Sequence, residues 1–314
     1  MFEKLKEILD RGERFLVATH IDPDGDALGS AFALSFALTT LNKESVVYLK
    51  DRVPYRYQFL PRPALIVNEL PKEAFDAVLV VDCGDLSRVG DGHTSFKQME
   101  NLVNIDHHET NDGFGRINIV DGQASSTAEI LYSILKSLGV QFDFDIAVNL
   151  YTAVLTDTGS FRYESTTKEA FSICEEMTQF GVRPSYVAGE VYESHPKERF
   201  QLLCLVLGTL ETFDDDRIAC AQVTREMFER TGTNREYSEG FVEYLKEIRG
   251  VEVACLAREV GDGQYKVSMR SKDGVDVAAV AHTFGGGGHE RAAGCTIQGS
   301  IDVVKNKLIG AFSL

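Results

Sequence analysis

Four segments of the 314-residue sequence combine carboxylates with imidazole or hydroxyl groups in a pattern that could hold metal ions. Their polar residues, in chain order, are His20, Asp24 and Asp26; Asp82; Asp106, His107 and His108; and Thr156, Asp157, Thr158 and Ser160. Carboxylates that are packed together repel one another, and a shared cation removes this repulsion. Four negative charges would come from Asp24, Asp26, Asp82 and Asp157, and two divalent cations would balance them.

The types of ligand narrow the choice of ion. Carboxylates and imidazoles without a thiolate favour a fairly hard octahedral ion, so we expect Mn²⁺, with Co²⁺ or Mg²⁺ as alternatives. Cys83 stands beside Asp82, but we interpret it as a small packing residue. At any single position a structural role is the commoner one, because an aspartate after a strand usually caps the next helix. The shared placement of all four segments favours the metal site.

The first half of the chain alternates short apolar runs with helical patterns. Strands are expected over 15–19, 45–50, 76–81, 102–105 and 116–120, and helices over 26–41, 126–138, 145–155 and 168–180. This alternation predicts an α/β fold with a mainly parallel, doubly wound sheet. Each polar segment follows a strand or ends a helix, and ligands of such sheets bind at the carboxyl ends of the strands. Ser126 and Glu129 fit a capping box, and the segment 125–127 could alternatively receive an anion.

The pattern changes in the second half. The chain is expected to be helical over 186–210, followed by strands over 218–223, 252–259, 265–270 and 293–297 and helices over 236–249, 275–283 and 301–312. Gly261-Asp262-Gly263 predicts a hairpin turn, and a glycine loop precedes the last strand. We therefore expect one domain over 1–187, a helical connector over 188–212 and a smaller α/β domain over 213–314.

Composition limits the classes of function. The 44% of hydrophobic residues indicate a folded chain, and no apolar run is long enough for a transmembrane helix, so no membrane association is expected. Six scattered cysteines without a CxxC pair argue against a zinc ribbon or a disulfide framework and favour a cytoplasmic setting. The net charge of −16 should repel a long polyanion, so binding to long duplex DNA is not expected.

The ordered motifs resemble those of the DHH phosphoesterase superfamily. They are HIDPDGDALGS (20–30), VVDCGD (80–85), IDHHETN (105–111) and LTDTGSFRY (155–163). The segments MRSKDGVDVAAVA (269–281) and FGGGGHERAAG (284–294) resemble the DHHA1 domain. The resemblance covers nearly the whole chain, and within the superfamily the sequence is most similar to the type that combines an oligoribonuclease (nano-RNase) with a 3′-phosphoadenosine 5′-phosphate phosphatase.

The resemblance implies two ion positions that share Asp82. One would be formed by His20, Asp24 and Asp82, and the other by Asp26, Asp82, His107 and Asp157. His108 would face the scissile phosphate, and Asp106 would orient a ligand from behind. Asp22 is left out of the ligand set, and Glu164 stands where a small or polar residue is expected. Two metals would activate a water as hydroxide for in-line attack on phosphorus.

The C-terminal domain would bind the other end of the substrate. Glycines lack side chains, so a phosphate or a base can approach their backbone closely, and a flexible hinge is the alternative interpretation. The residues expected to hold substrate are Arg270, Gly286, Gly287, Gly288, His289 and Arg291. Arg162 is expected to contact a phosphate or to form a salt bridge with a neighbour such as Glu164.

The expected activity is therefore hydrolysis of very short RNA to nucleoside 5′-monophosphates and of 3′-phosphoadenosine 5′-phosphate to AMP. A linear or cyclic dinucleotide phosphodiesterase is the nearest alternative. Family II pyrophosphatases share the N-terminal ligand set but have a basic C-terminal motif that is absent here, and a RecJ-like exonuclease would need additional domains. A non-catalytic nucleotide-binding regulator is the alternative from another class. The family also suggests a homodimer.

Overall fold

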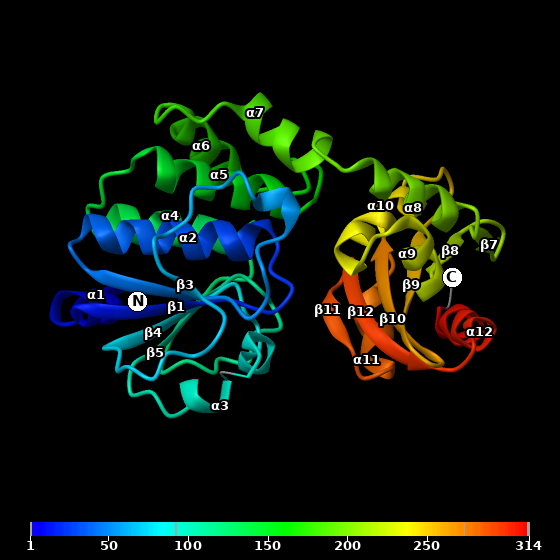
Figure 1. Ribbon diagram of the computed structural model, residues 1–314, viewed down its shortest axis with the longest axis horizontal. Helices are drawn as coiled ribbons and strands as arrows, with labels where there is room; N and C mark the ends of the chain where they lie inside the picture. Colours follow the sequence, from blue (N-terminus) through cyan, green and yellow to red (C-terminus); the bar gives the residue numbers. More distant parts are fainter. Residues whose placement is uncertain (1, 92, 273, 313–314) are drawn as a thin grey trace. The chain divides into compact units, whose positions relative to one another are not determined.

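A computed structural model describes residues 2–91, 93–272 and 274–312 and divides the chain into two compact units (Figure 1). The first unit is Met1–Ser194 and the second is His195–Leu314. Their boundary lies inside the region 188–212, where the sequence analysis expects a connector. Each unit has its own six-stranded sheet and its own apolar clusters, so each is described by itself.

The sheet of the first unit is entirely parallel. Its strands, in spatial order, are β3 (Ile66–Val67), β2 (Glu44–Tyr48), β1 (Arg14–Ala18), β4 (Ala77–Val81), β5 (Leu102–Asp106) and β6 (Ile117–Val120). From β1 the chain adds β2 and β3 on one side, and then β4, β5 and β6 on the other side. The strand order therefore reverses between the neighbours β1 and β4. Ligands of such sheets bind at this switch point. The predicted parallel sheet is confirmed, and only the two-residue β3 was not expected.

Alternating residues of the strands point into two apolar layers, one on each face of the sheet. Phe15 and Val17 face one layer, and Leu16 and Ala18 face the other. The first layer packs against α2 (Gly25–Thr40), α4 (Thr127–Ser137), α5 (Phe144–Asp157) and α6 (Lys168–Thr178), which Figure 1 shows on one side of the sheet. It also receives apolar residues from α1 (Phe2–Arg11) and α7 (Pro184–Ala188). The second layer is covered by the 3₁₀-helix η2 (Leu86–Val89) and by α3 (His93–Phe96). The 3₁₀-helix η1 (Tyr55–Tyr57) buries Tyr57 in the first layer.

Half of the predicted capping box forms at the start of α4. Ser126 Oγ accepts a hydrogen bond from the backbone N–H of Glu129 at 3.3 Å. The Glu129 carboxylate does not complete the box, because it accepts from the backbone N–H and hydroxyl of Ser125 at 3.0 and 2.6 Å. Helix α4 therefore begins where the sequence predicts, but the Glu129 carboxylate binds Ser125 and not the backbone N–H of Ser126.

The second unit contains a mixed sheet between helices. Its strands, in spatial order, are β11 (Gly287–His289), β12 (Ala292–Gln298), β10 (Gln264–Ser271), β9 (Val253–Gly261), β8 (Ile218–Val223) and β7 (Glu211–Phe213). The β8–β9 pair is parallel and the other pairs are antiparallel. One face packs against α11 (Val277–Thr283) and α12 (Ile301–Ala311), and the other against α8 (Lys197–Leu207) and α10 (Phe241–Lys246). The short helix α9 (Arg225–Thr231) was not expected.

Three expectations for this part of the chain are corrected. The helical segment over 186–210 is interrupted, because α7 passes into a π-helical turn (Gly189–Glu193) and α8 begins only after Pro196. The helix expected over 236–249 is split by Gly240, whose φ of 77° lies in the left-handed region, into a 3₁₀ turn (Arg235–Ser238) and α10. Part of the expected glycine loop is the edge strand β11.

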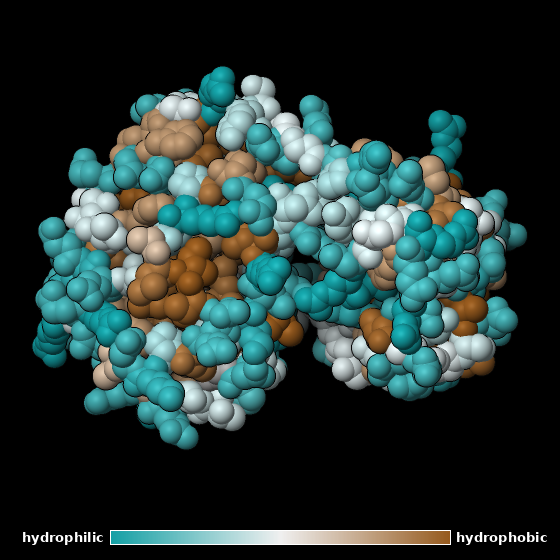
Figure 2. Space-filling view, viewed as in Figure 1, coloured by the Kyte–Doolittle hydropathy of each residue, from teal (hydrophilic) through white to brown (hydrophobic). Residues whose placement is uncertain are grey.

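The surface of the first unit carries an apolar area near the edge strand β3, where Leu65 is 47% exposed (Figure 2). Among the described residues, no helix combines the length and the apolar character that a membrane span needs. All six cysteines are free thiols.

Candidate metal centre

The predicted metal ligands gather at the carboxyl ends of the strands in the first unit. His20 follows β1, Asp82 comes directly after β4, and Asp106 ends β5 with His107 and His108 behind it. Because β1 and β4 are neighbours at the switch point, their ends meet at the same place. The parallel sheet therefore brings together side chains that are far apart in the sequence.

Asp82 lies at the middle of this group. Its side chain is 3% exposed, and its backbone has a φ of 55°, which a non-glycine residue rarely adopts. One carboxylate oxygen lies 3.5 Å from His20 Nε2, and the other lies 3.7 Å from His107 Nε2 and 3.8 Å from His108 Nδ1. Strained backbone of this kind concentrates at functional sites, where the surroundings hold it in place.

Asp24 and Asp26 are positioned by the start of α2. Asp24 caps the helix, since its Oδ1 accepts from the backbone N–H groups of Asp26 and Ala27. The capping interpretation of the sequence is thus confirmed here, and a capping carboxylate still has a second oxygen for another ligand. Asp26 is 1% exposed and accepts from Ser30 Oγ at 2.9 Å.

The N-terminus of α4 also holds Asp26. The backbone N–H groups of Thr127 and Ala128 donate to its two oxygens at 2.6 and 3.1 Å. The anion at this helix terminus is therefore a carboxylate of the chain itself. Thr127 also donates its hydroxyl to Asp82 at 3.0 Å, so it links two of the buried carboxylates.

The tautomers of two histidines can be read from their backbone contacts. His20 Nδ1 lies 2.7 Å from the carbonyl oxygen of Ile21, and His107 Nδ1 lies 3.3 Å from that of Ala124. A carbonyl oxygen only accepts, so each Nδ1 carries a proton, and Nε2 offers its lone pair whenever the ring is neutral. Both Nε2 atoms face carboxylates, which is the orientation that a metal-binding histidine needs.

Asp157 closes the group from the last residue of α5. Its carboxylate lies 3.3 Å from His107 Nε2, and 29% of its side chain is exposed. His107 Nε2 is thus 3.3, 3.7 and 4.0 Å from oxygens of Asp157, Asp82 and Asp26. Ligand bonds of about 2.1 Å place neighbouring octahedral ligands about 3.0 Å apart and opposite ones about 4.2 Å apart. The observed separations fall between these values and suit ligands that share an ion.

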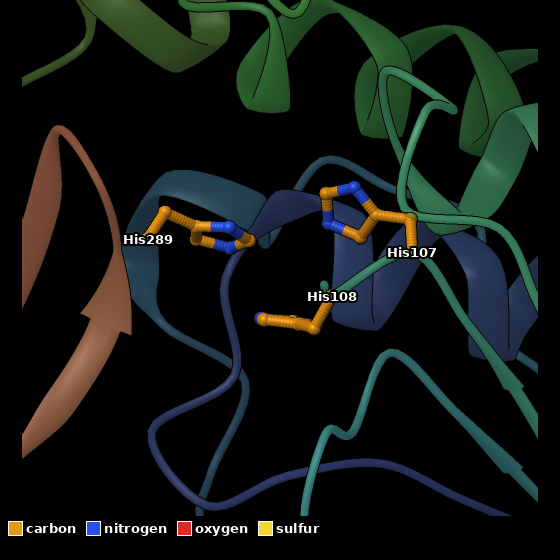
Figure 3. A group of neighbouring side chains, drawn as sticks. All are labelled: His107, His108 and His289. Atoms are coloured by element: carbon orange, nitrogen blue, oxygen red, sulfur yellow. The ribbon is translucent and has the colours of Figure 1, made fainter. Parts of the chain in front are cut away.

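His108 belongs to a separate hydrogen-bonded chain. Its Nδ1 donates to Asp106 Oδ1 at 2.7 Å, and the other oxygen of Asp106 accepts from Asn111 Nδ2 at 2.6 Å. Asn111 also donates to the carbonyl oxygen of Cys83 and accepts from Gly113 N–H. Figure 3 shows the rings of His107 and His108, whose centroids are 4.9 Å apart; His289, also drawn there, belongs to the second unit.

The electrostatics of the group fit a cation. Burial, with the negative charges of Asp82 and Asp157, raises the pKa of Asp26 well above its usual range. Burial, with the charges of Asp82 and Asp24, likewise raises the pKa of Asp157. Burial also works to raise the pKa of Asp82, but the imidazoles of His20, His108 and His107 hold it well below its usual range. A divalent cation would relieve the repulsion among carboxylates crowded in this way.

The donor set fits two cation positions. Ligand atoms of His20, Asp24 and Asp82 lie within 4.8 Å of one another, and so do those of Asp26, Asp82 and His107. Asp82, Asp106 and His108 form a third such group in this unit. A thiolate is not expected to take part, because burial raises the pKa of Cys83 to about 12 and its thiol donates to the carbonyl oxygen of Asp85. Hard oxygen and imidazole donors remain.

Comparison with known proteins identifies the family. The N-terminal domain of the DHH family matches residues 14–156, and the DHHA1 domain matches residues 215–312. The bifunctional oligoribonuclease and PAP phosphatase NrnA of Thermus thermophilus is 35% identical over 285 residues, which are 90% of this chain and 84% of that protein. The chain belongs to the DHH phosphoesterase family. As a member of it, the protein is a metal-dependent hydrolase of phosphoric esters.

Two further comparisons agree with this assignment. The bifunctional oligoribonuclease and PAP phosphatase NrnA of Bacillus subtilis is 25% identical to this DHH phosphoesterase over 288 residues, covering 91% of the chain and 90% of that protein. The crystal structure of an exopolyphosphatase-related protein from Bacteroides fragilis superposes with a TM-score of 0.91 at 25% identity. It covers 99% of this chain and 94% of that one, so the two-unit fold is shared over the whole length.

In the DHHA1 unit the glycines pack against their own sheet. An added Cβ at Gly286 would lie 2.1 Å from the carbonyl oxygen of Gly294, and one at Gly288 would lie 2.4 Å from that of Ala292. Gly288 also has a φ of 144°. At Gly287 the nearest atom would be 3.5 Å away, at ordinary contact distance. At Gly286 and Gly288 packing against β12 already requires glycine, because β12 occupies the place that a side chain would take.

The predicted substrate-binding arginines have partners within their own units. Arg270 donates from Nε to Glu243 at 2.8 Å and from Nη1 to the carbonyl oxygen of Met269. Arg162 donates from Nε to the carbonyl oxygen of Gly159 at 2.7 Å, and its side chain is exposed. His289 lies in β11, and the backbone of Arg291 accepts from Ser271 N–H.

Two residues that contact the metal centre, Asn111 and Thr127, were not predicted from the sequence. Asn111 stands at the end of the third motif, and the sequence did not show that its side chain donates to Asp106. Thr127 lies in the segment interpreted as a helix cap, and its hydroxyl points instead to Asp82. The signal for Thr127 was the possible anion site at that helix terminus, but the sequence did not show which anion it holds.

Proposed function

We propose that the protein hydrolyses very short oligoribonucleotides to nucleoside 5′-monophosphates and 3′-phosphoadenosine 5′-phosphate to AMP. The observation that carries the proposal is the buried carboxylate and imidazole cluster around Asp82 at the switch point of the sheet. Such a cluster suits a phosphoric ester, whose negative charge must be neutralised before a nucleophile can approach. The activities named for the Thermus and Bacillus relatives support the choice of substrates.

We assign the cluster to two cations, for which Mn²⁺ fits the hard oxygen and imidazole donors. His20, Asp24 and Asp82 would hold one, and Asp26, Asp82, His107 and Asp157 would hold the other. When bound, such a pair lowers the pKa of a coordinated water and neutralises charge on the phosphate. Asp82 would bridge the two positions, since its two oxygens face His20 and His107 respectively.

His108 is proposed as the residue that acts on the phosphate. Asp106 accepts the Nδ1 proton and fixes the ring, and Asn111 in turn holds Asp106. The pKa of His108 is raised because its carboxylate neighbours Asp106 and Asp82 outweigh the effect of burial, which lowers it. A protonated Nε2 can donate to a phosphate oxygen or give its proton to the leaving oxygen. Asp106 would act as a positioning residue.

The DHHA1 unit would hold the other end of the substrate through a small number of contacts. His289 and Arg291 would grip a phosphate or base, and the glycine backbone over 286–288 would allow close approach. Arg270 would contribute Nη2, because its Nε donates to Glu243 and its Nη1 to the carbonyl oxygen of Met269. With a net charge of −16, affinity should come from a few contacts and not from a long basic track, so long duplex DNA is not a proposed partner. A homodimer is proposed from the family alone. We place the protein in the cytoplasm because its six cysteines are free thiols.

A panel of substrates tests the function. The wild-type protein would be incubated with Mn²⁺, Co²⁺ or Mg²⁺ and with oligoribonucleotides of two to ten residues, 3′-phosphoadenosine 5′-phosphate, cyclic dinucleotides or pyrophosphate. We expect mononucleotide from the shortest RNAs, AMP from 3′-phosphoadenosine 5′-phosphate, and rates that fall as the RNA lengthens. Preferred cleavage of cyclic dinucleotides or pyrophosphate would overturn the proposed substrates. Tight binding of a dinucleotide without turnover would make the protein a regulator.

A further inference from the structure

Two phenylalanines form an exposed ring stack on the first unit, beside the fourth motif. The centroids of Phe161 and Phe171 are 4.8 Å apart, and their planes are inclined by only 20°. Phe171, on α6, is 55% exposed, more than any other large apolar side chain among the described residues. Phe161 is half-buried against the apolar layer of the unit. The face of the Phe171 ring that Phe161 does not cover is therefore available to another flat group.

An unusual backbone conformation presents Phe161 in this position. Gly159, Ser160 and Phe161 have φ values of 56°, 60° and 62°, so three consecutive residues lie in the left-handed region. L-residues other than glycine adopt that region at a cost of about 1–2 kcal/mol each. Thr158 holds the turn, because its Oγ1 accepts from Phe161 N–H at 3.1 Å. Strain that the surroundings maintain is a reason to look for a function.

A series of contacts links the stack to the metal centre. Thr127, at the start of α4, donates to Asp82, and Glu129 on the same helix accepts from Thr167 Oγ1 at 2.7 Å. Thr167 caps α6, and Phe171 lies one turn further along that helix. From Phe171 the ring contact leads to Phe161.

Phe161 is also close in sequence to a predicted metal ligand. Phe161 is four residues beyond Asp157, which limits their Cα separation to about 14 Å. Two connections therefore join the stack to the predicted ligands. Phe171 is connected through α6, and Phe161 is connected through the turn after α5.

We propose that the Phe161–Phe171 stack binds a nucleobase of the substrate next to the phosphate that is cleaved. This inference rests on the proposed function, and it adds the place where the base is held. Every base offers a flat π-face, so stacking gives affinity without sequence preference. Arg162 follows Phe161 directly, and its exposed guanidinium supplies a positive charge beside the stack for the sugar-phosphate backbone. A single open ring face bordered by a cation matches a base better than it matches a protein partner, which would need a larger apolar area.

The kinetic test compares substrates with and without the base. Phe171→Ala should raise KM for a diribonucleotide about tenfold or more, while an otherwise identical dinucleotide with an abasic residue should lose little. Phe171→Tyr should keep the affinity of the wild-type protein, and Phe171→Leu should not, because it retains apolar bulk without a ring. Phe144→Ala is the matched control, since Phe144 is 45% exposed at the opposite end of α5, about 20 Å from Asp157.

A binding measurement separates failure of the stack from failure of the proposed function. A dinucleotide containing 2-aminopurine loses fluorescence when its base stacks, and the titration needs no turnover. We expect quenching with the wild-type protein and with Phe144→Ala, and little quenching with Phe171→Ala. Equal quenching by all three proteins, or none by the wild-type protein, would overturn the stack even if hydrolysis is observed. A change of oligomeric state in Phe171→Ala with unchanged quenching would make the surface a subunit contact instead.

Discussion

The glycine run of the DHHA1 unit gives a prediction that separates packing from ligand binding. Gly286→Ala would place a Cβ 2.1 Å from the carbonyl oxygen of Gly294, and Gly288→Ala would place one 2.4 Å from that of Ala292. Both clashes are with strand backbone, which cannot swing aside. Overpacking of this kind costs about 1–3 kcal/mol, and at Gly288 the φ of 144° adds about 1–3 kcal/mol of backbone strain. Gly287→Ala meets nothing closer than 3.5 Å, so we expect a change within about 0.5 kcal/mol.

Thermal unfolding of the full chain, followed by calorimetry, measures this difference. For a unit of this size 1 kcal/mol shifts Tm by roughly 4 °C, so Gly286→Ala should lower the transition of the second unit by about 4–12 °C and Gly288→Ala by up to about 24 °C. Gly287→Ala should unfold like the wild-type protein and serves as the matched control. The packing argument would be refuted by three variants of equal, wild-type stability. Such a result would mean that the glycines are present for the ligand.

Three other substitutions test the proposed roles of Thr127, His108 and Glu243. Thr127→Val removes the hydroxyl that donates to Asp82 without changing the side-chain volume, so Mn²⁺ affinity should fall about 10–100-fold in a calorimetric titration; unchanged affinity would show that this link is not needed. His108→Gln should lower kcat at least 100-fold while the protein still binds metal, and a variant of normal rate would exclude His108 from the chemistry. Burial works to raise the pKa of Glu243, but the positive charges of Arg270 and Lys246 lower it below its usual value. The ionised Glu243 carboxylate therefore stabilises the fold above the unfolded pKa of about 4.3, and this stabilisation is lost as the pH falls through the folded pKa. The difference in Tm between Glu243→Gln and the wild-type protein should therefore be largest near pH 7 and shrink below about pH 4, and a difference independent of pH would contradict this.

The parallel sheet and the gathering of the polar segments could be predicted because both depend on local patterns. Apolar runs followed directly by His20, Asp82 or Asp106 identify strand ends, and parallel strands bring those ends to one edge. Whether two such residues touch is not a local property. The link from Thr127 to Asp82 joins residues 45 positions apart, and the segment 125–127 indicates a cap or an anion site without showing which side chain Thr127 contacts.

The glycine run shows the same limit in the second unit. Four consecutive glycines predict an open loop, because a glycine is most easily explained by flexibility or by close approach of a ligand. The structure explains Gly286 and Gly288 by β12, which pairs with β11 and leaves no room for a side chain. The break at Gly240 has a similar origin, since a single glycine inside a helical pattern does not by itself show that the backbone becomes left-handed.

Asp82 is proposed to be shared between two cation positions, and the proposed chemistry depends on this sharing. Titration of the metal-free protein with Mn²⁺, followed by calorimetry with the ion content measured independently, tests it most directly. We predict two ions per wild-type chain and, for Asp82→Asn, a fall of at least 100-fold in affinity at both positions in a protein that remains folded. Two ions bound by Asp82→Asn with wild-type affinity, or a single ion bound by the wild-type chain at saturation, would contradict the shared centre.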